Sequence, residues 1–103
     1  MSIRYDGKVA IVTGSGQGLG RSHAIELAKR GAKVVINDLG GAKDGTGGSS
    51  EAALTVVAEL EALGGEAIAN GANVARYEEV EAMVKQTMDK WGRVDILVNN
   101  AGI

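Results

Sequence analysis

The apolar positions of the chain form four short runs, separated by segments with a different spacing. The runs at residues 9–12 (VAIV), 33–38 (KVVIND) and 94–99 (VDILVN) show little alternation with polar residues. This pattern is typical of strands that are buried on both faces, as in a parallel sheet. The fourth run, at residues 66–70 (EAIAN), is a weaker strand by composition, and its place between two predicted helices supports it.

Three segments between these runs have helical spacing. Residues 18–30 (GLGRSHAIELAKR) end with two cations, and Gly31 follows as a stop signal. After a glycine-rich loop at 39–48, a second helix is expected over about 51–63, with Ser49 or Ser50 as its N-cap. Its apolar positions are Leu54, Val57, Leu60 and Leu63. A third helix is expected over about 76–91, and its apolar face consists of Val80, Met83, Val84, Thr87 and Met88.

The alternation of strands and helices predicts an α/β fold. Right-handed crossovers then favour a Rossmann-like, doubly wound parallel sheet with strand order 3-2-1-4, numbered along the chain. Ligands bind such sheets where the strand order reverses, over the carboxyl ends of the strands. We therefore expect residues 13–20, after the first strand, to lie beside residues 99–102, after the last one.

Composition limits the classes of protein. The chain has 103 residues, so it forms one domain at most, and its formal net charge is −2. The 11 Lys and Arg residues are scattered, which argues against a nucleic-acid partner. There is no cysteine, so disulfides and thiolate metal sites are excluded, and no metal site is expected. The sequence has no leader pattern or membrane-length apolar run, and a cytoplasmic location is expected.

Four glycines occupy alternate positions between residues 14 and 20, directly after the first strand. A strand, a glycine turn and a helix N-terminus together form a favourable place for a phosphate. The dinucleotide spacing G-x-G-x-x-G does not fit, whereas T-G-x-x-x-G-x-G fits Thr13, Gly14, Gly18 and Gly20. We expect Gly14 to allow the turn, Gly18 to admit the pyrophosphate, Gly20 to allow close helix packing, and Gly16 to add flexibility. The alternative is a tight turn without a ligand.

Asp38 ends the second strand, twenty residues after Gly18. In such folds a carboxylate at this position accepts hydrogen bonds from the two hydroxyls of an adenosine ribose and repels a 2′-phosphate. Leu39 follows, and residues 14–20 include no Lys or Arg. NAD is therefore predicted in preference to NADP, with a solvated turn carboxylate as the alternative.

The stretches TGSGQGLG at 13–20 and NNAG at 99–102, with Asp38 between them, resemble the short-chain dehydrogenase/reductase family over the whole chain. The resemblance implies that Gly14, Ser15, Gly18 and Leu19 contact the pyrophosphate and that Asp38 binds the ribose. It further implies that Asn73 and Val74 flank the adenine and that Asn100, Ala101 and Gly102 line the cofactor. The family commonly has Asp where this chain has Asn73, whose amide oxygen could still accept a hydrogen bond from the adenine amino group.

Members of this family transfer a hydride between a nicotinamide and an alcohol or carbonyl carbon, with a Tyr-x-x-x-Lys pair to move the proton. Tyr5 is followed by Val9 and Tyr77 by Glu81, so neither tyrosine belongs to such a pair. We expect residues 1–103 to be the N-terminal, NAD-binding part of one domain, without catalytic residues and without turnover. The complete protein is expected to be a homo-oligomer.

The stretch NDLGG at 37–41, with the loop after it, is similar to the (3R)-hydroxyacyl-CoA dehydrogenases of multifunctional β-oxidation enzymes. This resemblance implies an acyl thioester substrate. A dinucleotide-binding sensor without catalysis is the alternative. His23 is expected to be a packing or surface residue, and Glu78, Glu79 and Glu81 to form a solvated helix face.

Overall fold

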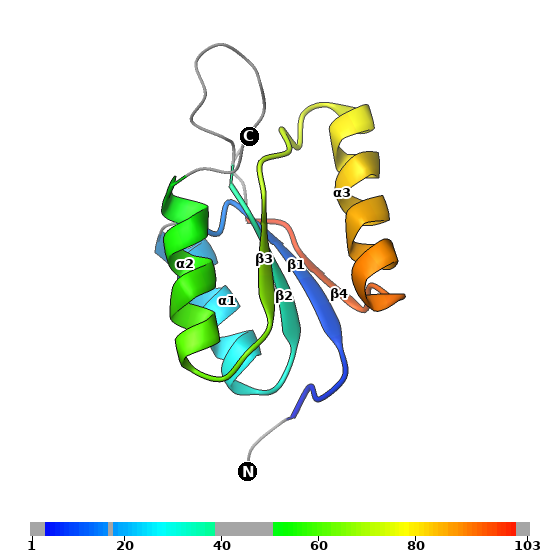
Figure 1. Ribbon diagram of the computed structural model, residues 1–103. Helices are drawn as coiled ribbons and strands as arrows, with labels where there is room; N and C mark the ends of the chain where they lie inside the picture. The colour runs from blue at the N-terminus through cyan, green and yellow to red at the C-terminus, as the bar shows by residue number, and fades with distance from the viewer. Residues whose placement is uncertain (1–3, 17, 39–50, 101–103) are drawn as a thin grey trace.

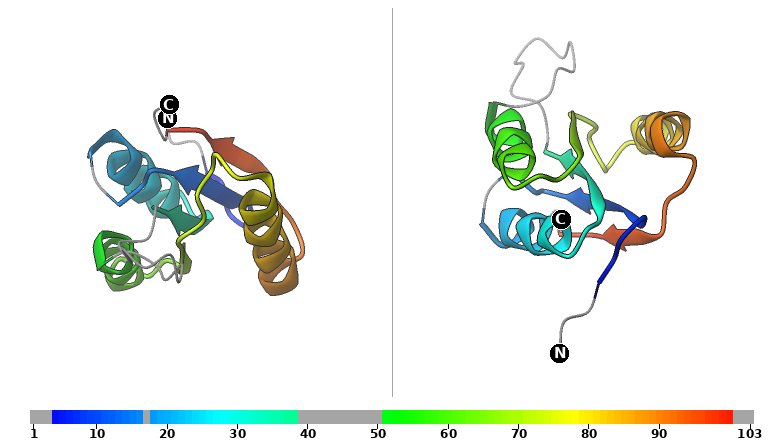
Figure 2. Two further views of the ribbon diagram at one scale, coloured as in Figure 1. Left: turned by 90° about the horizontal axis from the view of Figure 1, so that it is seen from above. Right: turned by 60° about the horizontal axis from the view of Figure 1, so that its bottom comes forward.

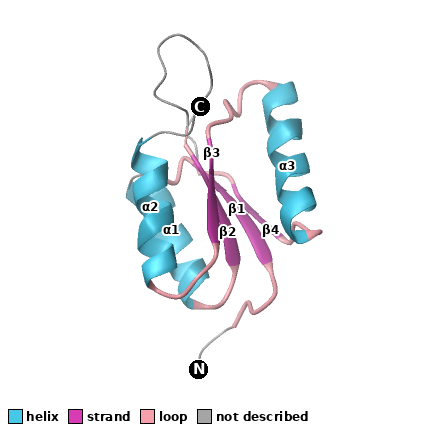
Figure 3. Ribbon diagram, in the orientation of Figure 1, coloured by secondary structure: helices cyan, strands magenta, loops and turns pink. Residues whose placement is uncertain are grey.

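The computed structural model describes residues 4–16, 18–38 and 51–100. Seven elements alternate along the chain (Figures 1 and 3). They are β1 (Val9–Thr13), α1 (Gly18–Lys29), β2 (Lys33–Asn37), α2 (Glu51–Ala62), β3 (Ala67–Asn70), α3 (Tyr77–Trp91) and β4 (Ile96–Val98). The predicted sequence of elements is confirmed, although β4 is shorter than the run at 94–99. The expected loop at 39–48 and the N-cap candidates Ser49 and Ser50 lie outside the described residues.

The four strands form one parallel sheet in the order β3-β2-β1-β4, as predicted. In its register, Ile11 of β1 lies opposite Val35 of β2 and Leu97 of β4. Because all four strands run in the same direction, their carboxyl ends meet at one edge of the sheet. This edge carries the residues that follow each strand.

Helices cover both faces of the sheet. Figure 2 shows α1 and α2 on one face and α3 on the other. Val12 and Ile36 pack in the cluster of the first face, whereas Ile11 and Val35 pack against Met83 of α3. Successive strand residues point to opposite faces, so two covered faces require apolar residues at every position. This explains the absence of polar alternation in the strands.

The apolar face predicted for α2 is partly wrong. The buried residues of this helix are Ala53, Val56 and Leu60, whereas Leu54 and Leu63 are exposed. Residues three apart are about 60° short of a full turn, so two residues nine apart lie on opposite sides of the helix. The leucine spacing therefore cannot make one face, and the small side chain of Ala53 occupies the buried position.

The predicted face of α3 is also too wide. Met83 and Thr87 are buried, and Val80 packs partly buried against the same cluster, but Val84 and Met88 are exposed. Within the described part of the chain, Ile11, Val35 and Ala72 are the buried partners that meet Met83. Met88 is outside this cluster and exposed, so its predicted place on the buried face of the helix is wrong.

Asp95 joins the amino ends of β1 and β4. Its side-chain oxygen Oδ2 accepts the Val9 backbone N–H at 2.9 Å, and its own N–H donates to the Val9 carbonyl at 2.9 Å. The hydrogen bond from the Arg93 guanidinium, and then the bond from Val9, lower the pKa of the Asp95 carboxyl group. These bonds fix the start of β4 beside β1.

The two methionines of α3 provide a matched test of this packing. Replacing Met83, which is 1% exposed, with Ala should lower the free energy of unfolding by about 2–5 kcal/mol because it leaves a cavity under the helix. The same change at Met88, which is 44% exposed, should cost less than about 1 kcal/mol. Urea denaturation of the two variants measures the difference, and equal losses would contradict the observed orientation of α3.

Candidate functional site

The candidate site is the edge of the sheet where the four strands end. Thr13 ends β1, Asp38 follows β2, Asn70 ends β3 and Asn100 follows β4. All four residues carry polar groups, and hydrogen bonds join neighbouring strand ends. Hydrogen bonds therefore link the ends of all four strands across this edge of the sheet.

The contact between the ends of β1 and β4 confirms the predicted approach of two segments far apart in the sequence. The Asn100 backbone N–H donates to the Thr13 hydroxyl oxygen Oγ1 at 2.9 Å. The Asn100 side-chain nitrogen Nδ2 donates to the Gly14 carbonyl at 3.3 Å. The start of the NNAG stretch is thereby fixed against the glycine turn. Ala101 and Gly102, which were predicted with Asn100, lie outside the described residues.

The glycine turn begins at Gly14, whose φ of 62° lies in the left-handed region that favours glycine. Gly20 is needed because of a close approach. A Cβ atom at Gly20 would lie 2.7 Å from the Asn100 side-chain nitrogen and 2.8 Å from the Gly14 carbonyl carbon. The helix α1 therefore lies directly against the turn and the end of β4, which agrees with the packing role predicted for Gly20.

Gly16 has a different role from the predicted one. A Cβ atom at Gly16 would lie 2.8 Å from Cγ of Asp38 and 3.0 Å from Cβ of Ala52. Gly16 is buried, and its missing side chain makes room for the Asp38 carboxyl group. The expectation of added flexibility is therefore wrong, because the position is tightly surrounded. The contact brings the predicted phosphate turn and the predicted ribose carboxylate together.

Ser15 supports the turn from inside. Its hydroxyl donates to the Val12 carbonyl at 2.7 Å, and its backbone N–H donates to the Asn37 carbonyl at 2.8 Å. The side chain is fully buried. The backbone N–H and the hydroxyl hydrogen of Ser15 are thus both used within the protein. The N–H bond joins the turn to the end of β2.

The first turn of α1 follows the glycine turn. Backbone N–H groups in the first turn of a helix have no partner within the helix, and they form the positive end of its dipole. Gly18 and Leu19 occupy this turn, and both are exposed. Gly18 has a φ of 60°, so a side chain there would be strained. The arrangement is a backbone cradle that suits an anion.

Asn73 and Val74 lie in the turn between β3 and α3. The Asn73 side-chain oxygen Oδ1 accepts the Ala75 N–H at 2.9 Å, which closes a local turn. The Asn73 N–H donates to the Glu79 carboxylate at 2.9 Å. Glu79 was predicted as part of a solvated face, but it is only half-exposed and fixes this turn. Glu79 also pairs with Arg76, the N-cap of α3, at 3.6 Å.

Two asparagines belong to the site although the sequence did not single them out as site residues. Asn37 is 2% exposed, and its amide donates to the Ala72 carbonyl at 3.1 Å. Asn70 lies opposite Asn37 in the β2-β3 register. The available signal was an amide side chain directly after an apolar run, because a buried amide must find hydrogen-bond partners.

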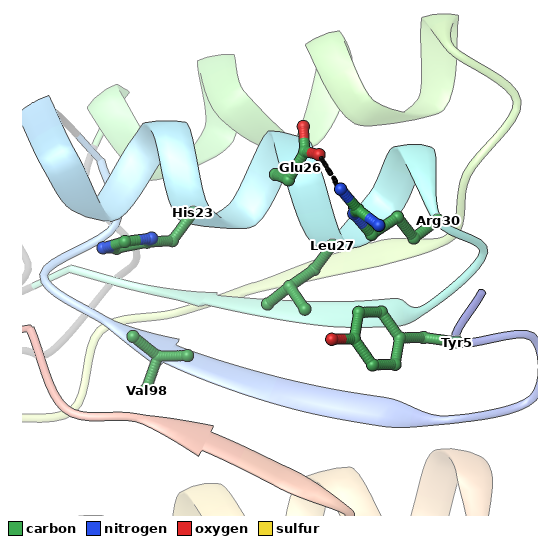
Figure 4. Close-up of a pocket in the computed structure, with 6 residues that line it drawn as sticks. All are labelled: Tyr5, His23, Glu26, Leu27, Arg30 and Val98. Carbon is green, nitrogen blue, oxygen red and sulfur yellow. Dashed lines mark hydrogen bonds and ion pairs between the residues drawn. The ribbon is translucent and has the colours of Figure 1, made fainter. Parts of the chain in front are cut away.

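A pocket of about 300 Å³ lies elsewhere, between α1 and β4. Figure 4 shows it lined by Tyr5, His23, Glu26, Leu27, Arg30 and Val98, with an ion pair between Arg30 and Glu26. His23 is exposed there, as predicted for a surface residue. The pocket includes none of the residues predicted to bind the cofactor, so it is separate from the strand-end site.

Comparison with known proteins identifies the family. A family model described as short chain dehydrogenase matches residues 8–103. The chain belongs to this family. It is 54% identical over 103 residues to peroxisomal multifunctional enzyme A of Dictyostelium discoideum. It is 51% identical over 96 residues to a 3-oxoacyl-(acyl-carrier-protein) reductase of Synechocystis.

Solved structures agree with the fold of this short-chain dehydrogenase chain. A short chain dehydrogenase from Mycobacterium avium is 47% identical and superposes with a TM-score of 0.86 over 95% of this chain. A 7α-hydroxysteroid dehydrogenase, in complex with NADH and 7-oxo glycochenodeoxycholic acid, is 42% identical with a TM-score of 0.85 over 97% of this chain. The Rossmann-like fold and the family resemblance predicted from the sequence are confirmed.

The chain spans only part of its relatives. It covers 23% of the Dictyostelium enzyme, 36% of the Synechocystis reductase and 34% of the Mycobacterium avium structure. In the described residues, no helix is long and apolar enough to cross a membrane. Five relatives, among them the Dictyostelium enzyme, are named as peroxisomal, so the cytoplasmic location expected from the sequence is not confirmed and stays a prediction.

The close approach at Gly20 can be tested by Gly20→Ala. Alanine normally stabilises a helix interior by roughly 0.5–1 kcal/mol relative to glycine. Here the added methyl group meets the Gly14 backbone and Asn100, so we expect a net loss of about 1–3 kcal/mol in the free energy of unfolding. Chemical denaturation measures the change.

Ser22→Ala, at an exposed position of the same helix, is the control and should be neutral or slightly stabilising. A stabilised Gly20→Ala variant would show that α1 does not lie against the turn.

Proposed function

We propose that the strand-end site binds NAD and that the complete protein is an NAD-dependent dehydrogenase. The observation that carries this proposal is the joining of three segments at one edge. Asn100 is hydrogen-bonded to Thr13 and Gly14, and Gly16 makes room for the Asp38 carboxyl group. A phosphate cradle and a ribose acceptor thus lie in contact, as a dinucleotide requires.

In this proposal the pyrophosphate lies against the glycine turn and the first turn of α1. The backbone N–H groups of Gly18, Leu19 and Gly20 supply donors, and Gly14 provides the turn that leads to them. Ser15 supports the turn rather than the ligand, because its backbone N–H and its hydroxyl hydrogen are used inside the protein.

The adenosine half lies toward β2 and β3 in the same proposal. Asp38 accepts the ribose hydroxyls, and Asn73 and Val74 lie beside the adenine. The Asn73 oxygen already accepts one hydrogen bond from Ala75, so its bond to the adenine amino group uses the second lone pair. Asn100, Ala101 and Gly102 are proposed to line the cofactor, as the family resemblance implies.

The preference for NAD over NADP rests on charge. A 2′-phosphate would lie against the Asp38 carboxylate, and like charges at short distance repel strongly away from bulk water. Residues 14–20 contain no Lys or Arg to offset this repulsion.

The reaction is the transfer of a hydride between the nicotinamide and a hydroxyl or carbonyl carbon of the substrate. Relatives are named as multifunctional enzymes and as a 3-oxoacyl reductase, which supports a 3-hydroxyacyl or 3-oxoacyl thioester as substrate. This chain holds and orients the cofactor. No Tyr-x-x-x-Lys pair lies within residues 1–103 to move the proton.

The same family membership supports a homo-oligomeric complete protein.

The role of Asp38 is tested by Asp38→Asn in the complete protein. Removing the charge should weaken NADH binding by about tenfold, because one neutral amide oxygen replaces the two carboxylate oxygens that accept the ribose hydroxyls. It should also reduce the preference for NADH over NADPH, because the repulsion of the 2′-phosphate is removed.

Isothermal titration with both cofactors measures these effects, and Asp89→Asn, an exposed carboxylate near the end of α3, is the control. Tighter binding of NADPH than NADH by the unchanged protein would disprove the assignment.

The activity is tested by mixing the complete protein with NAD and a 3-hydroxyacyl thioester and recording the absorbance of NADH. We expect steady turnover by the complete protein and none by residues 1–103 alone. Binding of NAD without turnover of any hydroxyacyl thioester or other secondary alcohol would favour a sensor without catalysis. Turnover by the isolated chain would contradict the assignment of proton transfer to residues outside it.

A further inference from the structure

We propose that Asn37 is a positioning residue that holds the adenine-binding turn at a fixed place relative to Asp38. This inference rests on the proposed binding of NAD at the strand-end site. Asn37 would not touch the cofactor, because its side chain is buried beneath the edge of the sheet. It would act through the segment that leads from β3 to Asn73.

The side chain of Asn37 is directed toward that segment. Its amide nitrogen Nδ2 donates to the Ala72 carbonyl at 3.1 Å and lies 3.3 Å from the Asn70 side-chain oxygen. Ala72 directly precedes Asn73, the residue placed beside the adenine. The hydrogen bond from Asn37 therefore fixes the backbone one residue before the proposed contact.

The backbone of Asn37 holds the other half of the site. Its carbonyl accepts the Ser15 N–H at 2.8 Å and lies 3.3 Å from the Ser15 hydroxyl oxygen. Asn37 thus joins the glycine turn, through its carbonyl, to the turn after β3, through its amide. Within the described residues, the proposed phosphate and adenine contacts are connected through this residue.

Asn37 and Asp38 point to opposite faces of the sheet, because successive residues of an extended chain alternate. The Asp38 carboxyl group lies near Gly16 and Ala52, on the face covered by α1 and α2. The Asn37 amide lies on the side of Ala72, whose cluster packs against α3. Asp38 therefore supplies the proposed ribose acceptor on one face of the sheet, and Asn37 fixes the turn after β3 on the other face.

A second asparagine extends the contact to α3. The Asn70 side-chain oxygen accepts the Ala72 N–H at 2.8 Å, and its Nδ2 donates to Gln86 at 2.7 Å. Both backbone groups of Ala72 are consequently bonded to asparagine side chains. The Glu79 bond to Asn73 completes the support. The turn is held by side chains from β2, β3 and α3.

An asparagine at this position fixes the place of the turn after β3, and it does so at a cost in free energy. An apolar residue would suit a strand position that is 2% exposed, since a buried amide costs free energy unless it is hydrogen-bonded. Within the described residues, the amide nitrogen of Asn37 bonds to Asn70 and Ala72. Loss of the donor would leave the Ala72 carbonyl unsatisfied and free the turn to shift.

The test uses Asn37→Ala and Asn37→Asp in the complete protein. The aspartate has nearly the size of asparagine, so its ionised carboxylate keeps the volume, removes the donor to Ala72 and repels the Ala72 and Asn70 oxygens. We expect Asn37→Ala to weaken the binding of ADP-ribose, which carries the adenosine half without the nicotinamide, by about tenfold, the effect of roughly one lost hydrogen bond, and Asn37→Asp to weaken it at least as much. Gln86→Ala, an exposed and milder change, should weaken it by about twofold.

A second readout separates positioning from a general loss of stability. In turnover, KM for NAD should rise by about the same factor while kcat stays unchanged, because the nicotinamide lies away from this turn. Thr87→Val, a buried change in α3 next to Gln86, is the control for stability and should leave the ADP-ribose affinity unchanged.

The outcomes distinguish the two proposals. If the unchanged protein binds ADP-ribose and the Asn37 variants bind it equally well, the positioning role is disproved while the proposed function stands. If the Thr87 variant loses as much affinity as the Asn37 variants, the effect is general destabilisation and the inference is again wrong. If the unchanged protein does not bind ADP-ribose, the proposed function itself fails.

Discussion

Hydrogen bonds across the carboxyl ends of the four strands determine the geometry of this chain. Asn100 is bonded to Thr13, Ser15 to Asn37, and Asn37 to Ala72, so the bonds run from β4 through β1 and β2 to the turn after β3. The backbone hydrogen bonds between the strands set the strand order. The bonds at the strand ends fix the relative positions of the residues that follow the strands. A ligand that spans the edge therefore meets groups whose spacing is fixed before it arrives.

Three polar side chains at the strand-end site support the backbone. Ser15, Asn37 and Glu79 each bond to main-chain atoms inside the protein. Backbone donors have few degrees of freedom, so a site made from them loses little conformational entropy on binding. Gly20 serves the same end, because it lets α1 approach the main chain of the glycine turn more closely than a side chain would permit, and Gly14 supplies the positive φ with which that turn begins.

The sequence was sufficient to predict the order of elements, the sheet order and the approach of Asn100 to the glycine turn. Unbroken apolar runs and right-handed crossovers leave few alternatives for such a sheet. The buried faces of α2 and α3 were less predictable, because small Ala53 is buried and large Leu54 is exposed. Which residue of a helix is buried depends on how closely it approaches its neighbours, and this depends on contacts far apart in the sequence.

The roles of Asn37, Gly16 and Glu79 were not predicted for a related reason. Each depends on contacts between residues of different elements, such as the close approach of Gly16 to the Asp38 carboxyl group. A one-dimensional pattern indicates where a strand ends, but not which group fills the space beside it. The amide directly after an apolar run was the one local signal of the hydrogen bonds that hold the turn after β3.

The contact between Gly16 and Asp38 has a consequence for redesign of the cofactor preference. The two positions share one volume, so their substitutions should be non-additive, as is general for residues in contact. A larger or basic residue at 38 has to fit beside Gly16, and a side chain at 16 would meet both residue 38 and Ala52. Libraries intended to change the preferred dinucleotide should therefore vary residues 16, 38 and 52 together rather than one at a time.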